Sequence, residues 1–217
     1  MSKIKNIDEL MKHISDGMTI MIGGFMGVGT PEIFIDEIVK SGVKNLTIIA
    51  NDTGYPDKGI GKLIMNKQVK RVIASHIGLN PETGRQMNNK ETIVELVPQG
   101  TLAEQIRCGG AGIGGFLTQT GVGTIVEEGK KKIKIEDVEY LLELPLKADV
   151  ALIRGSIVDK QGNVYYNGAT RNFNPLMATA ADLVIVAAQR IVDTGDLDPN
   201  HVMTPGIFVD YIVGGEK

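Results

Sequence analysis

The stretch MTIMIGGFMGVGTPE, residues 18–32, decides the fold class. Its first five residues form a continuous apolar run, which is typical of a strand buried on both faces of a parallel sheet. Glycines follow, and Thr30 and Pro31 then stand where the N-cap and the first residue of a helix are expected. Apolar residues at helical spacing continue to Gly42, a typical helix end. The stretch therefore predicts a strand, a glycine loop and a helix.

A second apolar run at residues 46–50 completes a strand–helix–strand unit, which indicates a parallel sheet. We further predict helices at residues 8–15, 61–66, 101–107 and 175–181, and strands at residues 70–75, 92–97, 183–187 and 207–213. The helix at 101 begins with the capping-box pattern Thr-x-x-Glu. Residues 109–124 are expected to form a long glycine-rich loop, and residues 131–157 a β-rich antiparallel portion. The expected fold is α/β: an open, mainly parallel sheet flanked by helices, in a single domain over residues 1–217.

Composition excludes several classes of protein. The formal net charge of −3 gives no bulk attraction to nucleic acid or to an anionic membrane. A single cysteine, Cys108, excludes an intrachain disulfide and favours a reducing, cytoplasmic location. The longest apolar stretch, residues 20–29, is shorter than the roughly 20 residues that a membrane span needs. We therefore expect neither nucleic-acid nor membrane partners.

Several sequence patterns resemble known binding or catalytic motifs, but the surrounding residues do not fit those functions. Residues 110–115 satisfy the pattern GxGxxG, but a predicted helix precedes them, whereas dinucleotide binding needs a strand before the glycines and a helix after them. Residues 24–29 have the glycine spacing of a Walker A loop, but Thr-Pro follows where Lys-Ser/Thr would hold phosphate and magnesium. The three histidines share no ligand spacing, and no Gly-x-Ser-x-Gly elbow is present. Metal-dependent and serine-hydrolase chemistry are therefore not expected.

The glycine loop after the first strand is the remaining candidate site. Glycines at the carboxyl end of a strand let backbone N–H groups approach a ligand, and the following helix favours negative charge. Ligands of open α/β sheets bind at this edge. A turn that only packs the strand against the helix is an equally good interpretation of these residues taken alone.

A family resemblance favours the ligand-binding interpretation. Residues 16–31 resemble, at every defined position, the signature of the α subunit of family I CoA-transferases. Further blocks resemble the same family in the same order: Asn51-Asp52, then residues 97–104, 109–115, 142–149, 171–175 and 204–207. The resemblance covers essentially the whole chain, and within the family it is strongest to the butyrate–acetoacetate type of short-chain acid metabolism.

The resemblance implies a reaction and a partner. Family I enzymes move CoA between an acyl thioester, here acetoacetyl-, butyryl- or acetyl-CoA, and a free short-chain acid by a ping-pong mechanism. Their nucleophilic glutamate lies in a Ser-Glu-Asn-Gly-like segment of a β subunit. That tetrapeptide is absent here, and Glu127 and Glu128 are interpreted as a solvated turn, so no catalytic residue is assigned to this chain. The implied assembly is an α–β hetero-oligomer such as α2β2, with coenzyme A as its substrate and no metal.

The resemblance also implies site residues. The CoA-binding loop would comprise Gly24, Phe25, Met26, Gly27, Val28, Gly29 and Thr30. Asn51 and Gln99 would position substrates, because amides bind a carboxylate or carbonyl without adding charge. Without the resemblance, they are interpreted as a turn-forming Asn and an exposed loop Gln.

A stand-alone isomerase or a ligand-sensing domain is the alternative function for this sequence. The same architecture hosts stand-alone sugar-phosphate isomerases and ligand-sensing domains. An isomerase would need its own general base and a phosphate cradle, and a sensing domain would not need a β chain.

Overall fold

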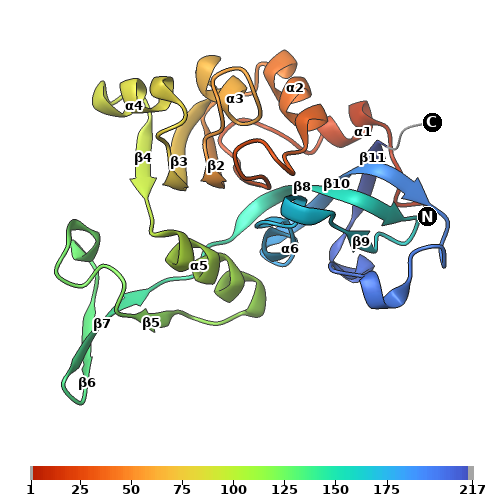
Figure 1. Ribbon diagram of the computed structural model, residues 1–217. Helices are drawn as coiled ribbons and strands as arrows, with labels where there is room; N and C mark the ends of the chain where they lie inside the picture. Colours follow the sequence, from red (N-terminus) through yellow and green to blue (C-terminus); the bar gives the residue numbers. More distant parts are fainter. Residues whose placement is uncertain (1, 215–217) are drawn as a thin grey trace.

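The computed structural model describes residues 2–214 and contains a large and a small β-sheet (Figure 1). Seven strands of the large sheet are mutually parallel, and a short eighth strand runs antiparallel to one of them. In spatial order the seven are β11 (Tyr211–Gly214), β10 (Ala181–Val192), β8 (Ala148–Asp159), β1 (Thr19–Ile22), β2 (Leu46–Asp52), β3 (Val69–His76) and β4 (Ile93–Leu96), and β9 (Val164–Tyr165) pairs with β8. The expected α/β fold with a mainly parallel sheet is confirmed.

The strand order reverses beside β1. From β1 the chain runs outward through β2 and β3 to β4, and it later returns to place β8 against the other side of β1. A ligand crevice is expected where the order reverses, outside the carboxyl ends of the strands. The glycine loop follows β1 directly and therefore lies at this position.

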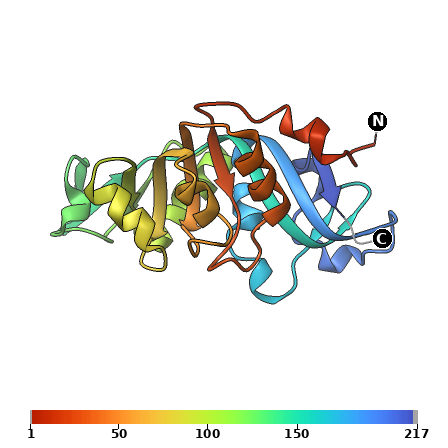
Figure 2. The same ribbon diagram turned by 90° about the horizontal axis from the view of Figure 1, so that it is seen from above.

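Helices cover both faces of the large sheet (Figures 1 and 2). One face carries α1 (Ile7–Met11), α2 (Glu32–Ser41), α3 (Gly61–Met65) and α4 (Pro81–Asn88), and the other carries α5 (Gln99–Ala111) and α6 (Asn174–Met177). Short 3-10 helices lie at Ile125–Glu127, Gly168–Thr170, Pro199–His201 and Gly206–Phe208. Successive side chains of a strand point to opposite faces, so Ile20 packs in the core beneath α2 while Met21 packs in the core of α5 and α6.

After α5 the chain turns back along the helix, and the small sheet forms an arm that projects at the lower left, beyond the start of α5 (Figure 1). Its antiparallel strands are β5 (Phe116–Thr118), β7 (Val138–Glu143) and β6 (Lys132–Ile135), with β7 in the middle. Glu143 is only 2% exposed and accepts hydrogen bonds from Lys130 Nζ at 2.6 Å and from Gln105 Nε2 at 3.0 Å. This buried, paired carboxylate ties the arm to α5.

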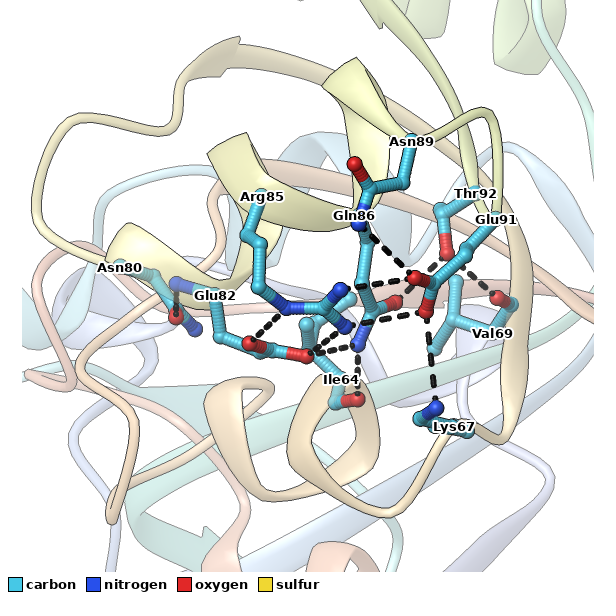
Figure 3. Close-up of polar contacts among 10 residues, drawn as sticks. All are labelled: Ile64, Lys67, Val69, Asn80, Glu82, Arg85, Gln86, Asn89, Glu91 and Thr92. Atoms are coloured by element: carbon cyan, nitrogen blue, oxygen red, sulfur yellow. Dashed lines mark hydrogen bonds and ion pairs between the residues drawn. The ribbon is translucent and has the colours of Figure 1, made fainter.

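An exposed ion cluster lies on α4, beside the edge strand β4 of the large sheet (Figure 3). Arg85 of α4 donates two hydrogen bonds to Glu82, at 2.7 Å each, and two to Glu91, at 2.7 and 2.9 Å. Gln86, buried beneath it, donates to the Ile64 carbonyl at 2.8 Å. The cluster joins α4 to the end of α3 and to the start of β4.

Several expected boundaries are wrong. The helix at residue 101 begins at Gln99, after Pro98, and Thr101 is buried without the capping hydrogen bond that we expected. The same helix continues to Ala111, so the glycine loop expected at 109–124 starts later and contains β5. Residues 131–157 were expected to form an antiparallel portion. Within this portion β6 and β7 pair antiparallel, but β8 joins the large parallel sheet. Helix α2 begins at Glu32 with Pro31 as its N-cap, one residue later than expected.

Candidate functional site

The glycine loop contains a tight turn at its tip. Phe25 and Val28 exchange two backbone hydrogen bonds of 2.9 Å each. Met26 and Gly27, between them, have positive φ angles of 50° and 84°. Two consecutive residues with positive φ are the mark of a type I′ turn, which strongly favours glycine at the second position. The sequence Met-Gly therefore shapes the tip of the loop.

Three buried or half-buried side chains fix the loop from outside. Asp52, at the end of β2, accepts from the Met26 N–H at 2.8 Å. Asn172 accepts from the Gly24 N–H at 3.0 Å and donates to the Val28 carbonyl at 3.1 Å. Asn174, fully buried, donates to the carbonyl of Gly29 at 3.1 Å. The loop is thus built into the fold on both of its sides.

These bonds change what the loop offers to a ligand. Within residues 24–30, only the N–H groups of Gly27 and Gly29 lack an acceptor in the part of the chain that the structure describes. The side chains at the tip are instead apolar and open to solvent: Phe25 and Met26 are each 40% exposed, and Val28 is 48% exposed. Of the backbone N–H groups expected to approach a ligand, those of Gly27 and Gly29 are therefore the ones left unpaired in the described structure. The tip of the loop presents apolar side chains.

The two amides assigned to substrate positioning lie in direct contact. Asn51, near the end of β2, is 2% exposed, and Gln99 is the first residue of α5. Gln99 Nε2 donates to Asn51 Oδ1 at 3.1 Å. Asn51 therefore belongs to a strand instead of a turn, and Gln99 to a helix N-terminus instead of a loop.

Both amides line an open cleft of about 420 Å³. Its walls are formed by loop, strand-end and helix residues: Phe25, Met26, Asn51, Asp52, Ser75, His76, Leu79 and Gln99. The structure thus brings Phe25 and Met26 together with Asn51 and Gln99. The other five residues of the expected CoA loop, Gly24, Gly27, Val28, Gly29 and Thr30, do not line this cleft.

Four lining residues were missed by the sequence reasoning: Asp52, Ser75, His76 and Leu79. Ser75 and His76 end β3, the neighbour of β2, and parallel strands end at the same edge of a sheet. That rule, applied to the strand predicted at residues 70–75, could have found them. Leu79 lies in the connection to α4, a helix that was not predicted.

The cleft holds little formal charge. Asp52 is the acidic residue of its lining and His76 the histidine, and neither lysine nor arginine is among the lining residues described. Both oxygens of Asp52 are engaged, since its Oδ1 accepts from the Gly54 N–H at 2.7 Å. No group of three or more His, Cys, Asp or Glu residues suited to a metal is found within residues 2–214. What the cleft offers a ligand is amide hydrogen bonding beside an apolar wall.

Comparison with known proteins identifies the family. Residues 4–215 match the coenzyme A transferase family. The chain belongs to this family. The family expected from the sequence is confirmed.

Similar CoA-transferase chains match along almost their whole length. One is the acetoacetyl-CoA:acetate/butyrate CoA transferase alpha subunit of Clostridium acetobutylicum, 59% identical over 212 residues, which are 98% of this chain and 97% of that one. Another is the acetate CoA-transferase subunit alpha of Escherichia coli K12, 55% identical over 216 residues, which are 100% and 98% of the two chains.

Solved CoA-transferase structures share the fold. An acyl-CoA transferase from Escherichia coli O157:H7 superposes with a TM-score of 0.86 at 23% identity, over 98% of this chain. This chain spans only 46% of that longer one. Glutaconate coenzyme A-transferase from Acidaminococcus fermentans gives the same TM-score at 19% identity, over 98% of this chain and 75% of that one. No helix within residues 2–214 has the length and apolar character needed to cross a membrane.

Proposed function

We propose that this chain is the α subunit of a short-chain acyl-CoA:carboxylate CoA-transferase that exchanges CoA among acetoacetate, butyrate and acetate. The observation that carries the proposal is the Asn51–Gln99 pair, which lines the cleft beside apolar side chains in a member of the CoA-transferase family. The names of the relatives support the same acids. The coenzyme A thioester is the substrate, and the proposal involves no metal.

The proposed reaction passes CoA through a glutamate of the β subunit. The glutamate carboxylate attacks the thioester carbonyl and expels CoA thiolate, which leaves an acyl–glutamyl anhydride. The thiolate then attacks the glutamyl carbonyl, releases the first acid as its carboxylate, and forms a glutamyl-CoA thioester. The second acid takes the CoA by the reverse steps. Splitting the exchange in this way replaces one difficult step with easier ones.

The composition of the cleft supports a nucleophile from a partner. Glutamate is absent from its described lining. Glu127 lies between β5 and β6 of the arm. It pairs with Lys132 at 2.8 Å, which lowers the pKa of the Glu127 carboxyl. Cys108 is fully buried in α5 and does not line the cleft. This chain would therefore contribute positioning groups, and the β subunit the attacking carboxylate.

The apolar wall supports short monocarboxylic acids as substrates. Phe25, Met26 and half-buried Leu79 face the space beside the amides. A second carboxylate on the substrate would need a cationic partner, and the described lining offers neither lysine nor arginine. The amides would bind the reacting carboxylate or carbonyl, and the apolar side chains the acyl group.

The proposed site at a subunit interface requires a permanent assembly. Such an interface should bury more than about 2,000 Å² in total, because a loosely joined site could not hold catalytic geometry. Exposed apolar side chains available for it include Leu96, at 50% exposure, and Leu144, at 61%.

Reconstitution tests the proposal. The purified chain, a β subunit and the co-expressed pair should be assayed with acetoacetyl-CoA against a panel of short acids. We expect turnover only from the pair, and mass-labelled trapping of the CoA adduct on a β-subunit glutamate. Turnover by the lone chain, or an adduct on one of its own glutamates, would contradict the proposed division of labour. Absence of any transfer by the intact pair would contradict the function itself.

A further inference from the structure

Ser75 contacts Asn51 at two points. Its hydroxyl oxygen lies 2.7 Å from the backbone carbonyl oxygen of Asn51 and 3.1 Å from Asn51 Oδ1. Ser75 is near the end of β3 and is half-buried, so this contact spans the two neighbouring strands β2 and β3. The single hydroxyl proton of a serine can be shared between two such acceptors.

Asn51 Oδ1 therefore faces two donors, Ser75 Oγ–H and Gln99 Nε2–H, both at 3.1 Å. A carbonyl oxygen has two lone pairs and can accept from both donors, while the Ser75 proton is shared with the closer backbone carbonyl at 2.7 Å. The amide nitrogen of Asn51 has no acceptor within residues 2–214, although the residue lines the cleft. Rotating the amide by half a turn would bring its NH2 group against the NH2 group of Gln99. With the Gln99 amide oriented to donate, its Nε2–H and the Ser75 hydroxyl proton together favour the Asn51 orientation that leaves the Nδ2 donor free for a ligand.

We propose that Ser75 is a positioning residue that holds the Asn51 amide with its NH2 group available to an anionic or carbonyl oxygen of the substrate. The proposal rests on the proposed function, because it assigns Asn51 a donor role in that reaction. A preorganised donor aimed at developing negative charge stabilises a transition state more than a freely rotating one. Ser75 acts through Asn51: its hydroxyl proton is directed at Asn51.

A double-mutant cycle in the assembled α–β enzyme tests this role. Ser75→Ala should lower kcat about tenfold, since one hydrogen bond of ordinary strength corresponds to roughly that factor in rate. In an Asn51→Ala background the same change should alter kcat by less than about twofold, because nothing remains to be positioned. Ser75→Thr keeps the hydroxyl on a residue that suits a strand, and it should recover most of the activity. An equal loss in both backgrounds, or a threonine variant as poor as the alanine variant, would overturn the proposal.

A second measurement does not depend on turnover. With only this chain isotope-labelled in the assembled protein, the side-chain NH2 signals of Asn51 can be assigned by their loss in Asn51→Ala. Ser75→Ala should shift these signals and accelerate their hydrogen exchange, whereas Ser75→Thr should leave them close to the parent. Unchanged Asn51 signals in Ser75→Ala would refute the positioning role. If the parent pair transfers no CoA while the signals respond as expected, the proposed function fails and the Ser75–Asn51 coupling stands.

Discussion

The carboxylate of Asp52 accepts a hydrogen bond from the backbone N–H of Met26 at 2.8 Å and so joins the end of β2 to the turn after β1. Its other oxygen accepts from the Gly54 N–H, and the side chain is only 5% exposed. Met26 has a positive φ angle, which a residue with a side chain adopts only when its surroundings hold it there. Asp52 supplies part of that support.

Replacing Asp52 should therefore destabilise the chain. Asp52→Ala leaves two N–H groups without their acceptor, and we expect the free energy of unfolding to fall by about 2 kcal/mol. Urea unfolding of the variant measures this loss. Asp57→Ala is the control, an exposed residue of the connection that follows β2. Equal midpoints for the two variants would show that the Asp52 contacts do not stabilise the loop.

Two glycines of the loop should respond differently to alanine. A Cβ on Gly24 would lie 2.1 Å from Thr30 Oγ1, whereas a Cβ on Gly27 would meet nothing within 4 Å. Both residues have a positive φ angle, so alanine at either position should lower the free energy of unfolding by about 1–2 kcal/mol through backbone strain alone. Gly24→Ala should lose clearly more stability than Gly27→Ala in urea unfolding, because it adds a steric conflict. Gly27→Asn should lose the least stability of the three variants, because asparagine tolerates a positive φ angle. Equal losses at the two positions would contradict this account.

Much of the fold follows from apolar periodicity. The runs at residues 18–22 and 46–50 predict β1 and β2 to within two residues, and Gly42 ends α2 with a φ of 71° as expected. Helix α4 was missed because its buried face is polar: Thr83 and Gln86 are the residues it buries, so it has no apolar stripe. A search for apolar residues at helical spacing cannot find a helix whose buried side chains are polar and hydrogen-bonded.

The extent of α5 was misjudged for a different reason. The sequence predicts Gly109 and Gly110 to be loop residues, yet they lie within the helix. A Cβ at Gly109 would lie 1.9 Å from the Leu146 carbonyl oxygen, and one at Gly110 would lie 2.1 Å from Thr179 Oγ1. These glycines permit close packing of the helix, which a sequence alone does not distinguish from loop flexibility. In the same way, Asn51 and Gln99 were identified through the family resemblance, because no local pattern indicates that residues 48 apart share a hydrogen bond.

The ion cluster of Figure 3 should give the stability of the chain a pH dependence. Hydrogen bonds from Arg85 hold the pKa of Glu82 and that of Glu91 at about 2, below the usual 4.5. Because the folded pKa lies below the unfolded one, the stabilisation is complete above pH 4.5 and is lost as the pH falls through about 2. Exposure to solvent keeps the contribution small.

Arg85→Met should therefore flatten the fall in unfolding free energy between pH 5 and pH 2. Urea midpoints across this range measure the slope. Salt at 1 M, which screens exposed charges over about 3 Å, should reduce the slope of the parent toward that of the variant. A variant that keeps the parent's slope would show that Arg85 does not set the pKa values of these two carboxylates.

Gln99 should matter for turnover in the proposed α–β enzyme. Its amide donates to Asn51 Oδ1 and lines the cleft, so its loss removes both a candidate ligand contact and one of the two bonds that orient Asn51. Gln99→Ala should lower kcat by roughly 10- to 1,000-fold, the upper range being that for loss of one polarising donor. Gln99→Glu should be no better, since a carboxylate would face Asn51 Oδ1 as a second acceptor and repel an incoming acid.

Melting temperatures distinguish a role of Gln99 in substrate positioning from a role in stabilising the fold. Gln99 is exposed, so neither variant should change Tm by more than a few degrees. Arg107→Ala is the matched control: it lies on the same helix, is exposed and contacts Glu104 across one turn, so its removal should leave both kcat and Tm near the parent values. Unchanged turnover of Gln99→Ala at saturating substrates would remove Gln99 from the site, and it would leave the donor role to Asn51 alone.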